Sequence, residues 1–385
     1  MANITWALNQ QYAETVLPNT VLLALGMAVG AMGNITVITL YMSRIRDKKG
    51  DRYFIPVLAF IDCLGCVANG SFYTTDNLFL FAYPSDILCR ILMFLLTFAS
   101  GFSAHILLVI ALQRYLLICR PFGKQLTLYR RRLSLGIITV ACLGYASPLL
   151  GIGGIRHGNS TFLNQTFESH TCVLSVETSS GTLLFFGLIA LITVANILVT
   201  GGLFIPITRA IYRTFSFQKK TIHCERKYKQ DAISQDTQIA HIQIQETDVN
   251  QQQQKQTSEI QRKLSSGKDV VGSPSTNKWE SKKERVKAKI NLMFMIIILV
   301  YILSYIPTLV ILILTYTLSG FTYLELSTAG INLWLFCARF LLLNHVVNPF
   351  IYGYFDVKLR AEFTKICCGF VKRKSDFSVD SQTVS

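Results

Sequence analysis

The residues of this chain with the clearest chemical potential are polar side chains inside long apolar stretches. Asp62, Arg339 and His345 are ionisable, and each is flanked by residues suited to a lipid environment. A charge at the centre of a bilayer costs at least about 2.5–3.5 kcal/mol on insertion scales, so such groups are functional candidates by default. The other polar residues in these stretches include Ser103, His105, Asn344 and Asn348. The set predicts a buried polar network inside a membrane protein.

Seven apolar stretches must position these side chains. Hydrophobic residues make up 51% of the 385 residues, and the mean hydropathy is +0.40. Each stretch approaches or exceeds the roughly 20 residues that a helix needs to cross about 30 Å of hydrocarbon. The predicted spans are 17–42, 53–82, 87–118, 133–152, 181–208, 290–318 and 326–354. We therefore predict an all-α membrane protein with a seven-transmembrane helix bundle.

The distribution of basic residues predicts the orientation of this bundle. The formal net charge is +15, and 34 of the 37 Lys and Arg residues fall in or beside alternate loops and the C-terminal segment. The positive-inside rule therefore places the N-terminus outside and the C-terminus in the cytoplasm. Because the positive charge follows the membrane topology, we expect a lipid bilayer as partner and no nucleic acid. The expected location is the plasma membrane.

Three N-glycosylation sequons lie on segments predicted to face outside. They begin at Asn3, Asn159 and Asn164. Their position agrees with the charge distribution, and we expect these asparagines to carry glycans. A fourth match begins at Asn34 inside the first predicted helix, so we expect it to stay unmodified.

The cysteines divide by their predicted compartment. Of the ten cysteines, only Cys89 and Cys172 are expected outside. Oxidising conditions there favour a disulfide between them, and the alternative is two free thiols. Cys367 and Cys368 follow the last span on a basic amphipathic stretch, where we expect palmitoylation.

Outside the predicted spans, which together form a bundle at 17–354 that includes its loops, the composition predicts little stable structure. Residues 1–16 form a predicted extracellular N-terminal tail, and 369–385 a cytoplasmic tail. Residues 355–368 predict a short amphipathic eighth helix at the inner membrane surface. The third cytoplasmic loop, 213–285, is rich in Gln, Lys, Ser and Thr. We expect it to be disordered, because it cannot bury enough apolar surface to fold alone.

Short motifs occur in a fixed order along the apolar stretches. They are Gly33-Asn34, Leu58-Ala59-Phe60-Ile61-Asp62, Gln113-Arg114-Tyr115, Ser304-Tyr305-Ile306-Pro307 and Asn348-Pro349-Phe350-Ile351-Tyr352. A step of 25 residues separates Cys89 from Arg114. In this order and topology the motifs resemble those of the rhodopsin-like (class A) G-protein-coupled receptors, over nearly the whole chain apart from the tails and the third inner loop.

The resemblance implies roles for these residues. Asn34 and Asp62 would anchor the polar core, where Ser103, Asn344 and Asn348 complete a small cavity that holds a sodium ion in the family. A structural sodium at Asp62 is therefore the one metal expected, and the alternative is a protonated Asp62 in a hydrogen-bonded cluster. No other cofactor and no enzyme activity are expected. The activation switch is assigned to Gln113, Arg114, Tyr115, Tyr305, Pro307, Pro349 and Tyr352.

The chain also departs from the family pattern. Gln113 replaces the acidic residue that usually precedes the switch arginine, so we expect raised basal activity. Tyr305 replaces the tryptophan usual above the proline of the sixth helix. Leu96 stands where amine receptors carry aspartate, and Leu342 where opsins carry the retinal-binding lysine. Both of those subclasses are therefore disfavoured.

The ligand is predicted less directly. The candidate pocket residues are Asp76, Leu96, Thr97, Ser100 and Arg339, and we expect Arg339 to pair with Asp76 or with a ligand carboxylate. The predicted outer segments carry six carboxylates against two arginines, a formal balance of −4. This favours a basic or amidated peptide ligand, with a small molecule or lipid as the alternative. A heterotrimeric G protein, arrestin and receptor kinases are the implied partners.

Three other functions compete with that of a signalling receptor. A transporter or channel would use Asp62, Arg339 and Asn344 as an ion path, but the sequence shows no inverted repeat and no ring of like charges. An enzyme is disfavoured because no HExxH or GxSxG motif is present. A receptor-like scaffold that binds a ligand without signalling stays open because of Gln113.

Overall fold

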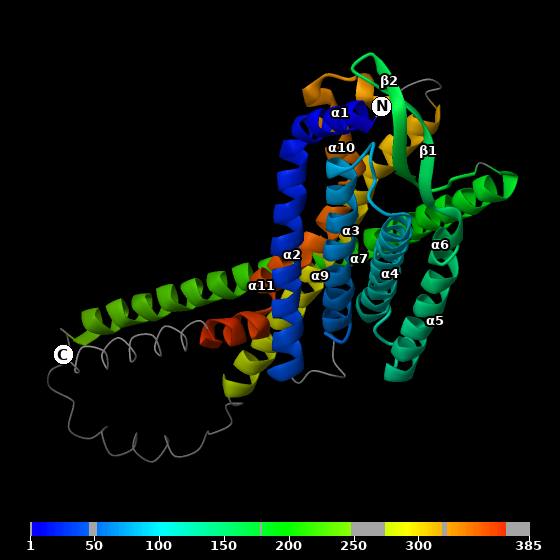
Figure 1. Ribbon diagram of the computed structural model, residues 1–385. Coiled ribbons are helices and arrows are strands. Elements are labelled where there is room, and N and C mark those ends of the chain that lie inside the picture. Colours follow the sequence, from blue (N-terminus) through cyan, green and yellow to red (C-terminus); the bar gives the residue numbers. More distant parts are fainter. Residues whose placement is uncertain (1, 46–51, 178, 248–273, 318–321, 367–385) are drawn as a thin grey trace, which may run out of the picture. The chain divides into compact units, whose positions relative to one another are not determined.

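The computed structural model describes residues 2–45, 52–177, 179–247, 274–317 and 322–366 (Figure 1). The chain divides into two compact units, one formed by Met1–Ile207 with Lys289–Ser385 and the other by Thr208–Ala288. The first unit contains the helix bundle. The second contains the inner part of one long helix and the start of the next.

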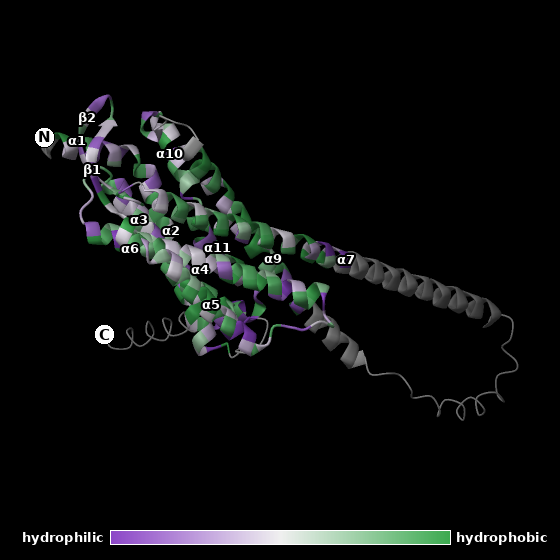
Figure 2. Cartoon of the chain, turned by 90° about the vertical axis from the view of Figure 1, so that its right-hand side faces the viewer, coloured by the Kyte–Doolittle hydropathy of each residue, from purple (hydrophilic) through white to green (hydrophobic). Residues whose placement is uncertain are grey.

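Helices account for most of the described residues. They are α1 (Ala2–Thr15), α2 (Leu17–Ser43), α3 (Ile55–Leu78), α4 (Asp86–Cys119), α5 (Leu128–Ala146), α6 (Leu149–Ile152), α7 (Ser180–Thr247), α9 (Pro274–Thr317), the 3-10 turn η1 (Tyr323–Glu325), α10 (Thr328–Ala338) and α11 (Leu342–Phe355). Six segments are long and apolar enough to cross a membrane, and α10 with α11 makes a seventh if the bent pair is one span. Figure 2 shows mostly hydrophobic residues along these helices. The predicted seven-helix bundle is therefore confirmed.

The third predicted loop differs from the expectation of disorder. α7 continues to Thr247 and α9 already begins at Pro274, so 213–247 and 274–285 are helical. Residues 213–247 contain no Gly and no Pro, so nothing in that sequence interrupts the helix that enters it. Residues 248–273 lie outside the described part of the chain.

The last span is broken, which its apolar pattern does not predict. α10 and α11 meet at a bend of 64°. Between them the amide of Leu342 donates to the carbonyl of Arg339 at 3.0 Å, and the amide of Leu343 to Phe340 at 3.0 Å. These three-residue steps tighten the backbone into a 3-10 turn, a recognised cause of a helix break. Pro349 lies inside α11, so the break between the two helices does not occur at this proline.

Close packing of α2 against α11 and α3 depends on two glycines. A Cβ atom at Gly33 would lie 2.9 Å from the Cβ of Pro349, and one at Gly30 would lie 2.5 Å from the Sγ of Cys66. Contacts this short do not occur between real side chains, so larger residues would push the helices apart. The small residues thus bring Asn34, one turn along α2, against α11 and into the polar core.

The N-terminal segment is a folded helix and not the tail predicted for 1–16. In Figure 1, α1 lies across the end of α2 beside α10. Leu8 and Tyr12 are one turn apart and pack with aromatic side chains from other segments, in a cluster completed by Val16, Phe81, Phe162, Phe167, Ile331 and Leu335. Burial raises the pKa of Tyr323, which contacts the Tyr12 hydroxyl at 3.4 Å, to about 12. The apolar face of α1 was not predicted from the sequence, because exposed polar residues separate Leu8 and Tyr12.

A two-stranded antiparallel sheet adds to the helices at the predicted outer end. β1 (Gly154–Phe162) pairs with β2 (Gln165–Val173). Leu163 and Asn164 form the turn, with φ values of 53° and 60°. Two left-handed residues are what a tight hairpin turn requires. The predicted disulfide is confirmed: Cys89 in α4 is bonded to Cys172 in β2. Among the described residues, this hairpin is the sheet that the all-α expectation did not include.

The predicted eighth helix is present at 357–366. Asp356 begins it, because its carboxylate accepts the amides of Lys358 at 2.9 Å and Leu359 at 3.4 Å. The same buried carboxylate accepts from Arg52 at 2.7 Å and from the Tyr41 hydroxyl at 2.5 Å. The ion pair with Arg52 therefore fixes the start of this helix against the predicted inner end of the bundle.

Candidate functional site

A cavity lies within the first unit between α4, α5, α7 and α9. Its volume is about 510 Å³, inside the range of about 300–1,000 Å³ that ligand pockets span. Among the described residues, its lining includes no Asp, Glu, Lys or Arg. Its polar lining residues are Thr97, Ser100, His105, Tyr145, Thr193, Asn196, Tyr301, Tyr305 and Thr308. An uncharged, mostly apolar ligand surface fits this lining.

Three of the five predicted pocket residues line this cavity. Leu96, Thr97 and Ser100 project from one side of α4 into it. Asp76 and Arg339 do not line it, and the prediction is corrected for these two. They lie instead in a separate polar cluster between α3 and the turn after α10.

That second cluster neutralises the guanidinium of Arg339. Its Nη2 donates to Asp76 at 3.0 Å, and its Nη1 donates to Asn19 and to Asn77 at 2.7 Å each. The guanidinium also stacks 4.9 Å from the ring centre of Tyr73. The expected pairing of Arg339 with Asp76 is thus observed, and the Arg339 side chain is 4% exposed. Three N–H groups of Arg339 are therefore engaged within the protein, in a cluster separate from the cavity.

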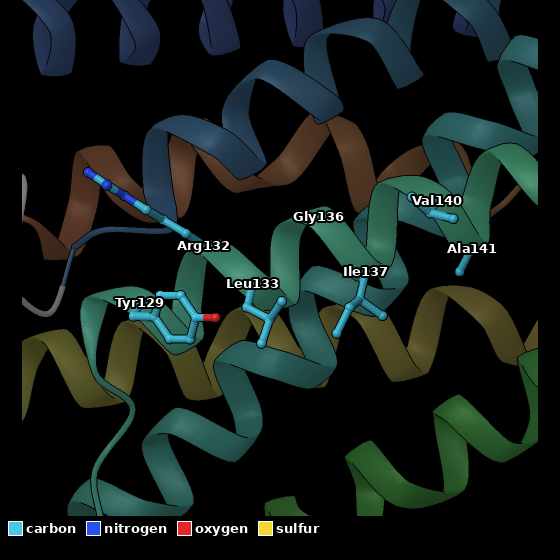
Figure 3. A pocket seen from close by; sticks show the side chains of 7 residues that line it. All are labelled: Tyr129, Arg132, Leu133, Gly136, Ile137, Val140 and Ala141. Carbon is cyan, nitrogen blue, oxygen red and sulfur yellow. The ribbon is translucent and has the colours of Figure 1, made fainter.

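A further hollow lies along the surface of α5, with side chains such as Tyr129, Leu133 and Val140 on its walls (Figure 3). All of its lining residues come from this one helix. Tyr129 is 73% and Val140 72% exposed. Exposed apolar side chains on a membrane-spanning helix face lipid, so this hollow adds no ligand site.

The predicted polar core is assembled around Asp62, which is fully buried. Its Oδ1 accepts from the Ser103 hydroxyl at 3.0 Å, and its Oδ2 accepts from the Asn348 amide at 2.7 Å. Asn344 donates to Ser103 at 3.3 Å. Asn34 joins α2 to α11 by donating to the carbonyl of His345 at 3.0 Å. The five residues assigned to the core therefore lie together.

His345 is the member of this core that sequence reasoning noticed without giving it a role. Its Nδ1 lies 2.9 Å from Asp62 Oδ1, and its Nε2 lies 3.4 Å from the hydroxyl of Ser100. The carboxylate can only accept, so Nδ1 carries the hydrogen. A Cβ atom at Gly65 would meet the imidazole ring at 2.7 Å, so the ring fills the space between α3 and α11.

This arrangement does not fit the expected sodium ion. Three protein donors use three of the roughly four acceptor positions of the Asp62 carboxylate. The imidazole N–H and the Ser103 hydroxyl both donate to the same oxygen, Oδ1. The side-chain oxygens of Asn344 and Asn348 have no hydrogen-bond partner among the described residues. They are nearby oxygen donors, but the carboxylate itself is occupied by protein groups.

The switch arginine contacts two uncharged side chains of α9. Arg114 is 1% exposed, donates to Asn291 of α9 at 3.1 Å and stacks 4.2 Å from the ring centre of Phe294. The neighbouring Gln113 is buried, and its side-chain amide has no hydrogen-bond partner among the described residues. Asn291 and Phe294 of α9 are thus neutral partners of Arg114, next to the position where the sequence predicted the loss of an acidic restraint.

The other predicted residues are distributed along the same helices. Tyr305 lines the cavity and donates to the backbone carbonyl of Ser100 at 3.3 Å. Tyr352 is fully buried in α11, with no hydrogen-bond partner for its hydroxyl among the described residues. Tyr115 is half-buried near the inner end of α4, and Pro307 lies within α9.

The predicted glycosylation sites lie in described parts of the chain, whereas the predicted palmitoylation sites do not. Asn159 and Asn164 are exposed on the hairpin, and Asn3 belongs to α1. Asn34 is buried, as its position within a helix predicts. Cys367 and Cys368 lie outside the described residues.

Sequence reasoning also missed Asn196 and Tyr301 at the cavity and Asn291 at the switch. The Tyr301 hydroxyl of α9 donates to Asn196 of α7 at 2.7 Å, so two cavity walls are joined. All three are polar residues inside predicted apolar spans. That position could have identified them, because lipid offers no hydrogen-bond partners to such side chains.

Comparisons with known proteins agree with this architecture. The sequence pattern of the family described as 7 transmembrane receptor (rhodopsin family) matches residues 33–352. Among solved structures, squid rhodopsin aligns with a TM-score of 0.59 at 14% identity, covering 93% of this chain and 85% of the rhodopsin chain. That likeness concerns the fold alone.

Three curated relatives share parts of the chain. The trissin receptor of Drosophila melanogaster is 29% identical over 188 residues, 47% of this chain and 27% of the relative. The prostaglandin E2 receptor EP2 subtype of Canis lupus familiaris is 28% identical over 165 residues, with coverage of 35% and 46%. The 5-hydroxytryptamine receptor 2B of Dichotomyctere fluviatilis is 30% identical over 168 residues, with coverage of 41% and 34%. The chain spans less than half the length of each relative.

Proposed function

The chain belongs to the rhodopsin family of seven-transmembrane receptors, and on that premise we propose that it is a plasma-membrane receptor that converts binding of an extracellular ligand into G-protein activation. The observation that carries this proposal is the direct contact between the ligand-sized cavity and the polar core. Ser100 lines the cavity and contacts His345, which contacts Asp62, which in turn accepts from Asn348. A change at the cavity wall therefore has a hydrogen-bonded route to α11.

The route supports a two-state mechanism. A ligand that repositions Ser100 or Tyr305 favours one hydrogen-bond arrangement of the core over another, because buried polar groups must keep partners in either state. Ligand binding then shifts the population by its difference in affinity for the two packings. At the inner end, release of Arg114 from Asn291 and Phe294 separates α4 from α9 and admits the G protein.

A peptide with a cationic or amidated group is the ligand class we favour. At the predicted outer end, Asp76 and Asp86 are paired with arginines, whereas Glu14, Glu168, Glu177 and Glu325 are exposed and belong to no ion pair among the described residues. These carboxylates attract cations, whereas the uncharged cavity receives apolar side chains. A peptide can supply both a positive charge for the outer surface and apolar side chains for the cavity.

A small apolar molecule is the second candidate, and the uncharged cavity lining favours it. The names of the three relatives, for trissin, prostaglandin E2 and 5-hydroxytryptamine, point to three different ligands and select none. Neutralising the exposed carboxylates separates the two candidates. A peptide should lose potency in a Glu168→Gln/Glu177→Gln variant, and an uncharged small molecule should not.

The proposal is tested by screening peptide and lipid libraries on cells that express the full chain, with G-protein activation as the readout. The matched control is an Arg114→Ala variant at equal surface expression, which should bind the same ligand without signalling. A ligand that activates the wild type and not the variant supports the receptor function. Binding without activation of any G protein in the wild type would identify a non-signalling scaffold. A ligand-independent ion current would identify a channel.

A further inference from the structure

The β1–β2 hairpin places two histidines directly opposite one another. His157 pairs with His170 in the register of the strands, and their ring centres are 4.5 Å apart at an angle of 75°. Their Nδ1 atoms face each other at 2.5 Å. At such a separation the lone pairs of both nitrogens converge on one point, where a proton on one ring is shared with the other. A metal ion uses the same converging lone pairs.

We propose that His157 and His170 form a binding site for a divalent transition-metal ion on the outer face of this receptor. Imidazole nitrogen is the commonest metal ligand in proteins and binds zinc at about 2.0–2.1 Å. Tetrahedral or square-planar angles then place two nitrogens about 2.9–3.4 Å apart. The side chain of His157 is exposed and that of His170 half-buried, so a small rotation opens the pair to this spacing.

The backbone of the site is held in place before any ion binds. The amide of His170 donates to the carbonyl of Phe81 at 2.8 Å, and its carbonyl accepts from the amide of Tyr83 at 2.9 Å. Two residues further on, Cys172 is bonded to Cys89 of α4. Because β2 is fixed on both sides, chelation orders only two side chains, and little conformational entropy is lost.

The ligand set selects the class of ion. Two nitrogen donors without a thiolate suit Cu²⁺, Ni²⁺ and Zn²⁺, with Cu²⁺ bound most tightly, whereas Mg²⁺ and Ca²⁺ require oxygen ligands. No third His, Cys, Asp or Glu lies near enough to complete a cluster among the described residues. Water fills the remaining positions, so the bound ion stays exchangeable. Such a site can sense an ion without depending on it for folding.

The surrounding charges favour a cation. Asp86 interacts electrostatically with His157, although it is also paired with Arg90 at 2.6 Å. Glu168 lies two residues before His170 in β2, hence on the same face of the hairpin, and it is exposed. By the same alternation, Arg156 belongs to the opposite face, where it donates to the carbonyl of Ser175. The local balance beside the histidines is therefore negative.

The hairpin connects this site to the ligand cavity. β2 ends at Val173, and the next residue, Leu174, lines the cavity. An ion between the two strands fixes their spacing and hence the position of Leu174. This regulatory effect rests on the proposed receptor function, whereas binding of the ion does not. The two can therefore be measured separately.

Metal binding is measured on the purified, ligand-free full chain in nanodiscs, isolated through a tag without histidine. Titration calorimetry with Cu²⁺, Ni²⁺ and Zn²⁺, and electron paramagnetic resonance of the Cu²⁺ form, should show one ion with two nitrogen ligands. His157→Gln and His170→Gln should each weaken binding at least about tenfold, the smallest loss typical of removing even a group that only supports a metal ligand. The double variant should lose the site.

The matched control is His223→Ala/His241→Ala, which removes two of the six histidines of the chain at other positions. This variant should bind the ion as the wild type does. Loss of binding in the control, unchanged binding in the double hairpin variant, or a resonance spectrum without nitrogen ligands would each overturn the proposal. If the ion binds but ligand affinity is unaffected by Zn²⁺, the site stands and its regulatory role is rejected.

Discussion

His345 should make the polar core independent of sodium, and replacing it should make the core sodium-dependent. In the structure the imidazole donates to Asp62 at 2.9 Å and fills the space facing Gly65. A His345→Ser variant removes one of the three donors to a buried carboxylate. Leaving a buried polar group short of a partner costs about 1–3 kcal/mol, and more for a charged group. The vacated space is then open to water and a cation.

Sodium should recover part of that loss in the variant only. An ion present at about ten times its dissociation constant stabilises the folded state by about 1.4 kcal/mol. For a domain of 150–250 residues, about 1 kcal/mol moves the unfolding midpoint by about 2–4 °C, and for this longer chain the shift is at the lower end. The assay is thermal unfolding of the purified chain in nanodiscs, with NaCl replaced by choline chloride at constant ionic strength.

Two further variants complete the test. Asp62→Asn combined with His345→Ser removes the carboxylate charge, so the unfolding midpoint of this double variant should be the same in NaCl and in choline chloride. His345→Asn keeps a side-chain donor and should stay closer to the wild type. If sodium raises the unfolding midpoint of the wild type as much as that of His345→Ser, the imidazole does not occupy the ion position and the reasoning is refuted.

Three other predictions rest on the same contacts. Gln113→Asp should lower ligand-free G-protein activation about fivefold at matched surface expression, because a carboxylate restrains the adjacent Arg114 more strongly than an amide by about 1 kcal/mol; equal basal output would contradict this. Arg339→Leu should destabilise the fold by up to about 3 kcal/mol in unfolding assays, because the mostly buried Asp76 loses its guanidinium partner, and adding Asp76→Leu should restore much of it. If the double variant is no more stable than the single one, the pair is not the cause. Cys172→Ser opens a loop closed across 83 residues, worth about 4–5 kcal/mol in the chain-entropy model, and should reduce surface expression and ligand binding; normal values of both would count against the disulfide's role.

Much of the bundle is predictable because lipid imposes a simple rule on the sequence. A run of about 20 apolar residues spans the membrane as a helix whatever its tertiary contacts. Polar residues inside those runs must then face one another, which is why Asp62, Ser103, Asn344 and Asn348 lie together as predicted. The disulfide was predictable from compartment alone, since only two cysteines were expected outside.

Features that depend on tertiary packing were not predictable in this way. The exposed residues of α1 read as a polar tail, and only Leu8 and Tyr12, one turn apart, show the face that packs. The break after Ala338 comes from a backbone turn at Arg339 and not from a proline, so composition gives no warning of it. The role of His345 depends on its distance to Asp62, which sequence spacing does not give.

In the proposed mechanism, a ligand in the cavity between α4, α5, α7 and α9 drives nucleotide exchange on a G protein through the polar core. The most direct measurement uses the purified chain in nanodiscs with purified heterotrimeric G proteins and the ligand found by screening. We predict ligand-stimulated nucleotide exchange with the wild type, and retained ligand binding without exchange for Arg114→Ala. Saturating ligand that leaves exchange on every class of G protein at the receptor-free rate would contradict the claim.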